Sequence, residues 1–294
     1  MTDRMGSVRW AFRCSSWLPS RSEWLFAARC IQPEEKERIG QFLFAKDAKS
    51  AMAGRLLLRR FVCEKMRVPW SQIHLERSPR GKPVLAAPME DSRRWSFNIS
   101  HQGDFAVLAA EQGLQVGVDI MKTCLPGSSS VSEFFRIMTR QFTPHEWAVI
   151  QSAGSETQQL AVFYRHWALK ESFIKAIGTG LGFNLQRVEF HLPTEALTPG
   201  RALRRTRMHL DEEEEGDWLF EESLLDEDHH VAVALGPAVA PELLPLHLPP
   251  PENFTVLSFS DLIAAASPLT EEDSAYWEDF KRKADAPTRQ SDSL

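Results

Sequence analysis

One carboxylate in this sequence stands inside a strongly apolar segment. Asp119 lies in the run VGVDI at residues 116–120, among side chains that favour burial. An unpaired charge in such surroundings would be costly, so the carboxylate must have a partner. It can bind a metal ion, or it can accept backbone N–H groups at the end of a strand. The residues by themselves leave both interpretations open.

A glutamate and a lysine lie four residues apart in the second half of the chain. Glu171 and Lys175 fall on one face of a segment with helical spacing, and Trp167 precedes them by one turn. The ordinary interpretation is an exposed ion pair worth about 0.2–0.5 kcal/mol. A bulky aromatic residue on the same stripe favours a partly buried pair instead. Gly178 follows this helix and indicates its end, not a dinucleotide-binding turn.

Two further segments carry groups that suit a phosphate. Residues 77–83 place three cations around Gly81 in a turn, which favours an anionic ligand. Residues 98–102 end a strand with polar side chains that could contact phosphate or metal-bound water. Such groups also form ordinary turns, so neither segment is decisive alone.

The first half of the chain must position these groups on one long helix and several short strands. Apolar residues at helical spacing, with arginines and lysines between them, predict an amphipathic helix with a basic face over residues 47–67. Strands are predicted at 72–75, 95–99, 105–110 and 115–120, the last two as a hairpin.

The second half repeats this order of elements. A helix is predicted at 160–177, followed by strands near 187–191, 218–223 and 230–235. The repeated order suggests two similar lobes. Residues 236–251 are too rich in proline for a regular element, whereas 254–266 are apolar enough to dock on the body. From Glu271 onward we expect a loosely held end.

The composition limits the class of protein. The chain has 294 residues, of which 43% are hydrophobic and 25% charged, as in ordinary soluble globular proteins. A net charge of −6 argues against general nucleic-acid binding. No apolar run approaches the roughly 20 residues that cross a bilayer, and the first residues lack a signal-peptide core. Four cysteines at irregular spacing are expected to be free thiols in a cytosolic protein.

Three ordered motifs resemble those of the two-lobed 4'-phosphopantetheinyl transferases. The family pattern Gly-(Ile/Val)-Asp matches residues 117–119, and Phe-(Ser/Thr)-x-x-Glu matches residues 142–146. The pattern Trp-x-x-Lys-Glu-(Ser/Ala)-x-x-Lys matches residues 167–175. Residues 80–83 and 98–101 add to the likeness, which extends from about residue 8 to residue 235.

The resemblance implies an α/β (α+β) fold of two pseudo-symmetric lobes, each a long helix packed on a small antiparallel sheet. The expected lobes are residues 1–122 and 123–236, followed by a proline-rich connection and a docking tail at 237–294.

The resemblance also implies a reaction. A monomeric cytosolic enzyme would transfer the 4'-phosphopantetheine arm of coenzyme A to a serine of a carrier protein and release adenosine 3',5'-bisphosphate. It would require Mg²⁺ and would act on carrier domains of the fatty acid synthase and aminoadipate-semialdehyde dehydrogenase types. No nucleic acid or membrane takes part.

Residue roles follow from the same resemblance. Asp119 and Glu171 would bind the metal, Gln102 would hold a metal-bound water, and Glu171, Lys175 and Asp119 would be the catalytic residues, with Glu171 as the base. Glu146 would hold the lobes or orient the site instead of touching reactants. Coenzyme A would be bound by Arg38, Arg77, Arg80, Gly81, Lys82, Asn98, Ile99, Ser100, His101, Asp119, Glu171 and Lys175.

One position departs from the family pattern. Many relatives carry an acid two residues after the aspartate, where this chain has Met121. A third carboxylate ligand is therefore missing, and water or Gln102 would complete the metal shell.

A different class of function stays open. A catalytically silent module could bind coenzyme A or carriers with the same fold, although the presence of Asp119, Glu171 and Lys175 favours an enzyme. An interaction protein without a ligand would leave the cation-rich turn unexplained. For carrier docking, we expect the basic helix, through Arg59 and Arg60. The alternatives are that these arginines are solvated helix surface, or that an apolar groove of the second lobe binds the carrier beside residues 134–142 and the helix that carries Glu171.

Overall fold

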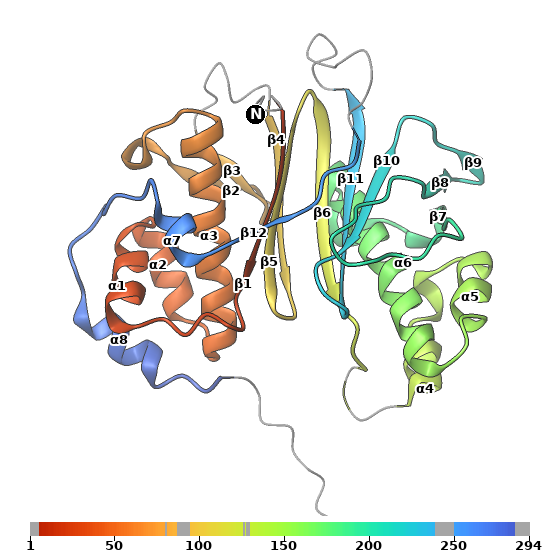
Figure 1. The fold of residues 1–294 in the computed structure, drawn as a ribbon, viewed down its shortest axis with the longest axis horizontal. Helices are drawn as coiled ribbons and strands as arrows, with labels where there is room; N and C mark the ends of the chain where they lie inside the picture. The colour runs from red at the N-terminus through yellow and green to blue at the C-terminus, as the bar shows by residue number, and fades with distance from the viewer. Residues whose placement is uncertain are drawn as a thin grey trace, which may run out of the picture. The chain divides into compact units, whose positions relative to one another are not determined.

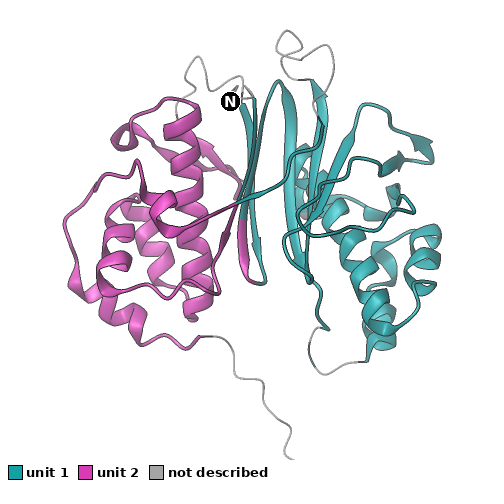
Figure 2. Cartoon of the chain, viewed as in Figure 1, with its two compact units in different colours: residues 1–10, 88–103, 107–255 teal, residues 11–87, 104–106, 256–294 magenta. Residues whose placement is uncertain are grey.

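The computed structural model describes residues 6–79, 81–86, 95–125, 127, 130–238 and 250–285. Contacts divide the chain into two compact units (Figure 2). Unit 1 comprises residues 1–10, 88–103 and 107–255, and unit 2 comprises residues 11–87, 104–106 and 256–294. The expected lobe boundaries at residues 122 and 236 stay a prediction.

Unit 2 is built around one long helix. Helices α1 (Arg21–Arg29), α2 (Pro33–Gly40) and α7 (Phe259–Ile263) all contact α3 (Ala45–Lys65), and α8 (Ser274–Lys281) contacts α1 and α2 (Figure 1). A 3₁₀ turn, η1 (Trp70–Gln72), leads into the antiparallel pair β2 (Leu75–Arg77) and β3 (Pro83–Leu85). The predicted strand at 72–75 is therefore wrong except for its last residue.

The expected basic face of α3 is not a solvated surface. Lys49, Arg55 and Arg59 are all buried, and Arg59 is 1% exposed. Its guanidinium donates to the carbonyl oxygens of Trp70 and Ile73 at 2.5 and 3.1 Å, which satisfies a charge that would otherwise be costly to bury. Arg59 is thus a structural residue, and the part of the docking hypothesis that rests on it is wrong. Arg60 is only partly buried, and carrier docking beside it stays a prediction.

The C-terminal segment packs on unit 2. Phe259 of α7 stacks on Trp17 with ring centroids 5.1 Å apart, which confirms the predicted docking of residues 254–266. Phe280 of α8 stacks on Trp24 at 3.8 Å, and Lys283 donates to backbone carbonyls of Gly40 and Phe42. The expectation of a loose end from residue 271 is wrong up to residue 285, because aromatic side chains anchor it there.

Unit 1 holds the other long helix, α6 (Glu156–Ile177). It packs on β6 (Leu114–Lys122) and β11 (His229–Ala238), which pair antiparallel in a sheet of order β10-β11-β6, with β10 at Leu219–Leu224 (Figure 1). Unit 1 also contains α4 (Val131–Ile137), η3 (Thr139–Gln141), α5 (Pro144–Gln151), η4 (Gly180–Gly182), η5 (Leu185–Arg187) and the small sheet of β7 (Val188–His191), β8 (Arg207–Leu210) and β9 (Glu213–Glu214). Of these elements, α5 and β7 contact α6.

The strand order differs from the predicted hairpin. A second sheet has the order β12-β1-β5-β4, formed by Thr255–Leu257, Ser7–Arg13, Phe105–Gln112 and Trp95–Gln102. Strand β5 therefore pairs with β4 and β1, whereas β6 pairs with β11. The mixed α/β fold with helices on small antiparallel sheets agrees with the predicted class. Among the described residues, no helix combines the length and apolar character needed to span a bilayer.

Strand β4 contacts β6 through side chains instead of through a backbone ladder. Ser96, Asn98 and Gln102 accept hydrogen bonds from the backbone N–H groups of Val116, Val118 and Lys122, at 3.1, 3.1 and 2.6 Å. Residues two apart on a strand share one face, so this face of β4 forms a row of acceptors. The row satisfies these three N–H groups of β6 and fixes the strand that carries Asp119.

Gly117 allows α6 to lie directly on β6. A Cβ atom there would overlap the carbonyl oxygen of Ser172 and would lie 2.5 Å from the backbone nitrogen of Ala176. Any side chain would push the helix away. The glycine of the first motif thus sets the distance between the strand that carries Asp119 and the helix that carries Lys175.

Candidate active site

Asp119 is buried but not fully paired. The residue is 5% exposed, and its Oδ1 accepts from Ser100 Oγ at 2.9 Å and from Lys175 Nζ at 2.6 Å. Within the described part of the chain, its Oδ2 is buried and accepts no hydrogen bond. A carboxylate oxygen left without a donor is costly, which favours a ligand at this position over a purely structural acceptor.

Lys175 pairs with Asp119, where the sequence suggested Glu171. Its side chain is 30% exposed and its Nζ also donates to Ser100 Oγ at 2.9 Å. The ammonium therefore sits at the edge of the site, with one side toward Asp119 and another accessible to a ligand. Such a position suits a cation that neutralises an incoming phosphate.

Glu171 lies one helical turn before Lys175. Burial and the negative charge of Asp119 raise the pKa of Glu171, and the positive charge of Lys175 opposes them. Asp119 and Glu171 are neighbouring carboxylates, and one oxygen of Asp119 has no hydrogen-bond donor among the described residues. Such a pair is an oxygen-donor set of the kind that a hard divalent cation prefers. The donor chemistry of these two residues therefore fits a hard divalent cation such as Mg²⁺.

The polar residues of β4 divide into two roles. Asn98 and Ser100 are buried and hold β6 and Asp119, while Ile99 is half-buried and His101 exposed on the alternate positions. Gln102 uses its Oε1 to accept from the Lys122 N–H. A carbonyl oxygen has a second lone pair, so the expected contact of Gln102 with a metal-bound water stays a prediction.

Unit 2 collects several of the predicted phosphate-binding cations. Arg38, Arg77 and Arg55 all place a nitrogen within 3.4 Å of one carboxylate, that of Glu35. Burial raises the pKa of Glu35, but the charges of the three arginines outweigh it and leave the pKa lowered. Three guanidinium groups on one carboxylate leave positive charge in excess. Among the residues described, Arg55 Nη1 is also buried without a hydrogen bond.

The turn next to this cluster presents backbone and lysine groups. The Ser78 N–H donates to the Lys82 carbonyl at 2.8 Å, and Gly81 takes a φ of 79°, which only glycine adopts readily. Arg77 also donates to the Gly81 carbonyl at 3.1 Å. Burial lowers the pKa of Lys82. Arg80 lies outside the described residues.

The second motif, residues 142–146, has a structural role in holding elements of unit 1 together. Glu146 is 0% exposed, and its Oε2 lies 2.7 Å from Lys170 Nζ and accepts the Thr143 N–H in a capping box at the start of α5. Its Oε1 accepts the Phe190 N–H at 3.0 Å. Burial raises the pKa of Glu146 and lowers that of Lys170, and the opposite charge of each partner counters this. The motif therefore joins α5, α6 and β7 within unit 1.

Two members of the arginine cluster were missed from the sequence. Arg55 and Glu35 did not stand out, although an arginine inside the otherwise uncharged, largely apolar run 51–58 of a helix is an unusual signal. The structural role of Lys170 was hidden inside the third motif. By contrast, Asp119, Ser100, Glu171 and Lys175 are brought together as a group, and they all belong to unit 1.

Comparisons of both halves of the chain with known proteins indicate one family. Residues 15–113 match the family model described as 4'-phosphopantetheinyl transferase, N-terminal, and residues 115–234 match that of the 4'-phosphopantetheinyl transferase superfamily. The L-aminoadipate-semialdehyde dehydrogenase-phosphopantetheinyl transferase of Xenopus laevis is 55% identical, covering 97% of this chain and 95% of that protein. Its Homo sapiens counterpart is also 55% identical, over 97% and 94%. A phosphopantetheinyl transferase of Thraustochytrium is 40% identical over 77% of each chain.

Proposed function

We propose how this chain carries out its reaction. The chain belongs to the 4'-phosphopantetheinyl transferase superfamily and is a transferase. The 4'-phosphopantetheine arm of coenzyme A passes to the serine hydroxyl of a carrier protein. A bond forms between the serine oxygen and the phosphorus that carries the arm. The pyrophosphate bond breaks, and adenosine 3',5'-bisphosphate leaves.

The buried, orphaned Oδ2 of Asp119 is the observation that carries this proposal. It lies in a site that also holds Lys175 and Glu171, and both carboxylates fit Mg²⁺. Bound there, Mg²⁺ would neutralise charge on the pyrophosphate as it separates. Lys175 adds a positive charge at the same place, and Ser100 holds the carboxylate of Asp119 in its orientation.

Glu171 accepts the proton of the serine hydroxyl, directly or through water. Burial and the charge of Asp119 raise the pKa of Glu171, which makes its carboxylate a better proton acceptor than an exposed glutamate. Phosphoryl transfer depends mainly on positioning and charge neutralisation, so one such base and the cations around it are sufficient machinery.

The cations of unit 2 and the exposed His101 bind the phosphates of coenzyme A. The excess positive charge of Arg38, Arg77 and Arg55 around Glu35 supports this assignment, together with the partly buried Lys82. Arginine forks and lysines are the usual partners of phosphate oxygens. We assign recognition of the 3'-phosphate of coenzyme A to His101 and to the basic turn, which we define as residues 77–82.

The partners are carrier-protein domains. The names of the animal relatives point to an aminoadipate-semialdehyde dehydrogenase, and we extend the proposal to carriers of the fatty acid synthase type. Cys14, Cys30, Cys63 and Cys124 are free thiols, which suits a reducing compartment, and we place the reaction in the cytosol.

The test is the mass of a purified apo carrier protein after incubation with coenzyme A and Mg²⁺. We expect an increase equal to the phosphopantetheine arm. Asp119→Asn and Glu171→Gln keep the side-chain shapes and should each slow transfer by about 10²- to 10³-fold or more, since each removes a charge on which the site depends. Near-normal transfer in either variant would remove that residue from the site.

A binding measurement separates the enzyme from the silent module. Isothermal titration with coenzyme A, with and without Mg²⁺, should show binding that Mg²⁺ strengthens. Binding without any mass increase on the carrier would instead support the silent module. Dephospho-coenzyme A should have a higher Michaelis constant than coenzyme A, and equal constants would remove the 3'-phosphate role of His101 and the basic turn.

A further inference from the structure

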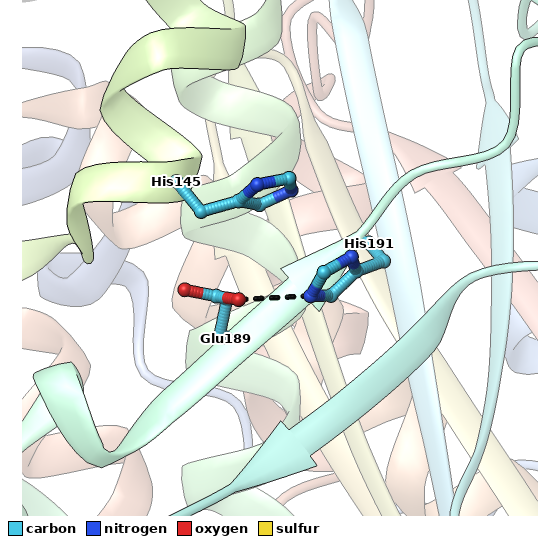
Figure 3. A group of neighbouring side chains, drawn as sticks. All are labelled: His145, Glu189 and His191. Atoms are coloured by element: carbon cyan, nitrogen blue, oxygen red, sulfur yellow. Dashed lines mark hydrogen bonds and ion pairs between the residues drawn. The ribbon is translucent and has the colours of Figure 1, made fainter. Parts of the chain in front are cut away.

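A second group of ligand-type side chains lies in unit 1 and shares no residue with the Asp119 site. His145, Glu189 and His191 point toward one another from α5 and β7 (Figure 3). Their ligand atoms all lie within 4.8 Å of one another, and His191 Nε2 is 2.8 Å from Glu189 Oε1. The rings of His145 and His191 stack with centroids 4.3 Å apart.

The local structure holds these side chains in register. His145 is the second residue of α5, whose start is capped by Thr143, and Glu189 and His191 lie two apart on one face of β7. Phe190 between them is buried and donates its N–H to Glu146 at 3.0 Å. The buried Glu146 therefore connects the start of α5 to β7. The three ligand-type side chains are thus carried by a helix and a strand that are held together.

A third histidine stands beside the group on β8. His209 is the direct cross-strand partner of Glu189, and its ring centroid lies 4.3 Å from that of His191. Its Nδ1 is buried and has no hydrogen-bond partner among the described residues. A buried ring nitrogen without a partner is costly, and a metal bond would satisfy it.

The donor set distinguishes this group from the Mg²⁺ site. Imidazole nitrogens with one carboxylate are typical ligands of Zn²⁺, whereas Mg²⁺ prefers oxygen donors and water. Bonds of about 2.0–2.2 Å place the ligands of a tetrahedral ion roughly 3.3–3.6 Å apart. The widest separation in the group, up to 4.8 Å, must therefore close by about 1 Å, and the 2.8 Å pair of His191 and Glu189 must open by about 0.5–0.8 Å. Small side-chain rotations at a half-exposed site supply that movement.

An ordinary ion pair does not account for the whole arrangement. One histidine would be enough to pair with Glu189, yet His145 and His209 each place a ring 4.3 Å from the ring of His191, which is the partner of this carboxylate. Protonated rings 4.3 Å apart would repel each other, whereas neutral rings can share one cation.

We propose that His145, Glu189 and His191 bind one Zn²⁺ ion, with His209 or water as the fourth ligand. The proton that His191 Nε2 donates to Glu189 moves to Nδ1 or to solvent, and no electron is transferred. The ion joins the start of α5 to β7. It therefore reinforces the contact that Glu146 of α5 makes with the Phe190 N–H of β7.

The first test is a zinc titration of the full-length, untagged protein in excess Mg²⁺. Mg²⁺ in excess keeps the carboxylates of the Asp119 site occupied. We expect one Zn²⁺ per chain and, at about 100 times the dissociation constant, a rise in the melting temperature of several degrees. His145→Gln and Glu189→Gln should each lower the zinc affinity at least about tenfold, as loss of a ligand does, and remove the rise.

His74→Gln is the matched control, because His74 is an exposed histidine of unit 2. It should leave the zinc affinity unchanged. Glu189→Gln preserves the shape of the side chain, so it decides the question even if a histidine variant fails to fold. The absorption spectrum of bound Co²⁺ reports the ligands directly, and it should change in Glu189→Gln but not in His74→Gln.

Three results would overturn the proposal. Zinc binding could be equal in Glu189→Gln and the unchanged protein, it could be lost in Asp119→Asn, or no stoichiometric binding could occur in excess Mg²⁺. None of these results bears on carrier modification, which the mass measurement tests separately.

Discussion

Replacing Gly117 with alanine tests whether the first motif sets the geometry of the site. The added Cβ would lie 2.5 Å from the backbone nitrogen of Ala176 and would overlap the Ser172 carbonyl, whereas ordinary contacts begin near 3.4 Å. The atoms that it meets belong to the backbone of α6, so a side-chain rotation cannot relieve the overlap. The helix must move away by about 1 Å, at a cost of about 1–3 kcal/mol for overpacking.

The same movement separates the reacting groups. Lys175 is carried by α6 and lies 2.6 Å from Asp119 on β6, so a shift of this size breaks their contact. Misplacement by 1 Å can cost about 10²-fold in rate. We expect Gly117→Ala to slow carrier modification by about that factor, measured by mass spectrometry, and to lower the midpoint of urea unfolding.

Gly216→Ala is the control for the glycine substitution. No atom lies within 4 Å of the Cβ position there, so both activity and stability should stay unchanged. Full activity and an unchanged unfolding midpoint in Gly117→Ala would refute the argument that close packing at this glycine sets the site.

Three further outcomes follow from charges in the structure. Lys170→Met leaves the buried Glu146 carboxylate without its partner and should lower the free energy of unfolding by about 3–5 kcal/mol, measured in urea. Burial lowers the pKa of His166 to about 3 and of His230 to about 4, so only the unfolded chain takes up these protons between about pH 4 and 6.5. The free energy of unfolding should therefore decrease as the pH is lowered through that window, by up to roughly 1.4 kcal/mol per pH unit for each histidine. The dependence should be weaker in His230→Phe, and an unchanged slope in this variant would contradict the prediction. Arg77→Ala should raise the Michaelis constant for coenzyme A by about tenfold or more, and an unchanged constant would remove it from phosphate binding.

The sequence by itself determined the chemistry of the site and much of its local structure. Helical spacing places Glu171 and Lys175 on one face, and an aspartate in an apolar strand needs a partner. The long helices at 45–65 and 156–177 and most strands agree with the predicted segments. Local periodicity suffices for these features, because it reports which face of an element is apolar.

Only the tertiary structure decided which elements cover those faces. Arg59 has the spacing of a surface residue, yet η1 supplies carbonyl acceptors that satisfy it in the core. Likewise, Ser96 and Asn98 of β4 replace a strand partner for β6, which strand propensity does not reveal.

The pairing of distant charged and ligand-type side chains was also decided in three dimensions. Glu146 meets the Phe190 N–H 44 residues away, and this contact aligns His145 with Glu189. No local pattern links such positions, because their separation along the chain is unrelated to their distance in space. The physical reason is that burial forces each polar group to find a partner, and the partner is whichever group the packed chain brings within hydrogen-bond reach.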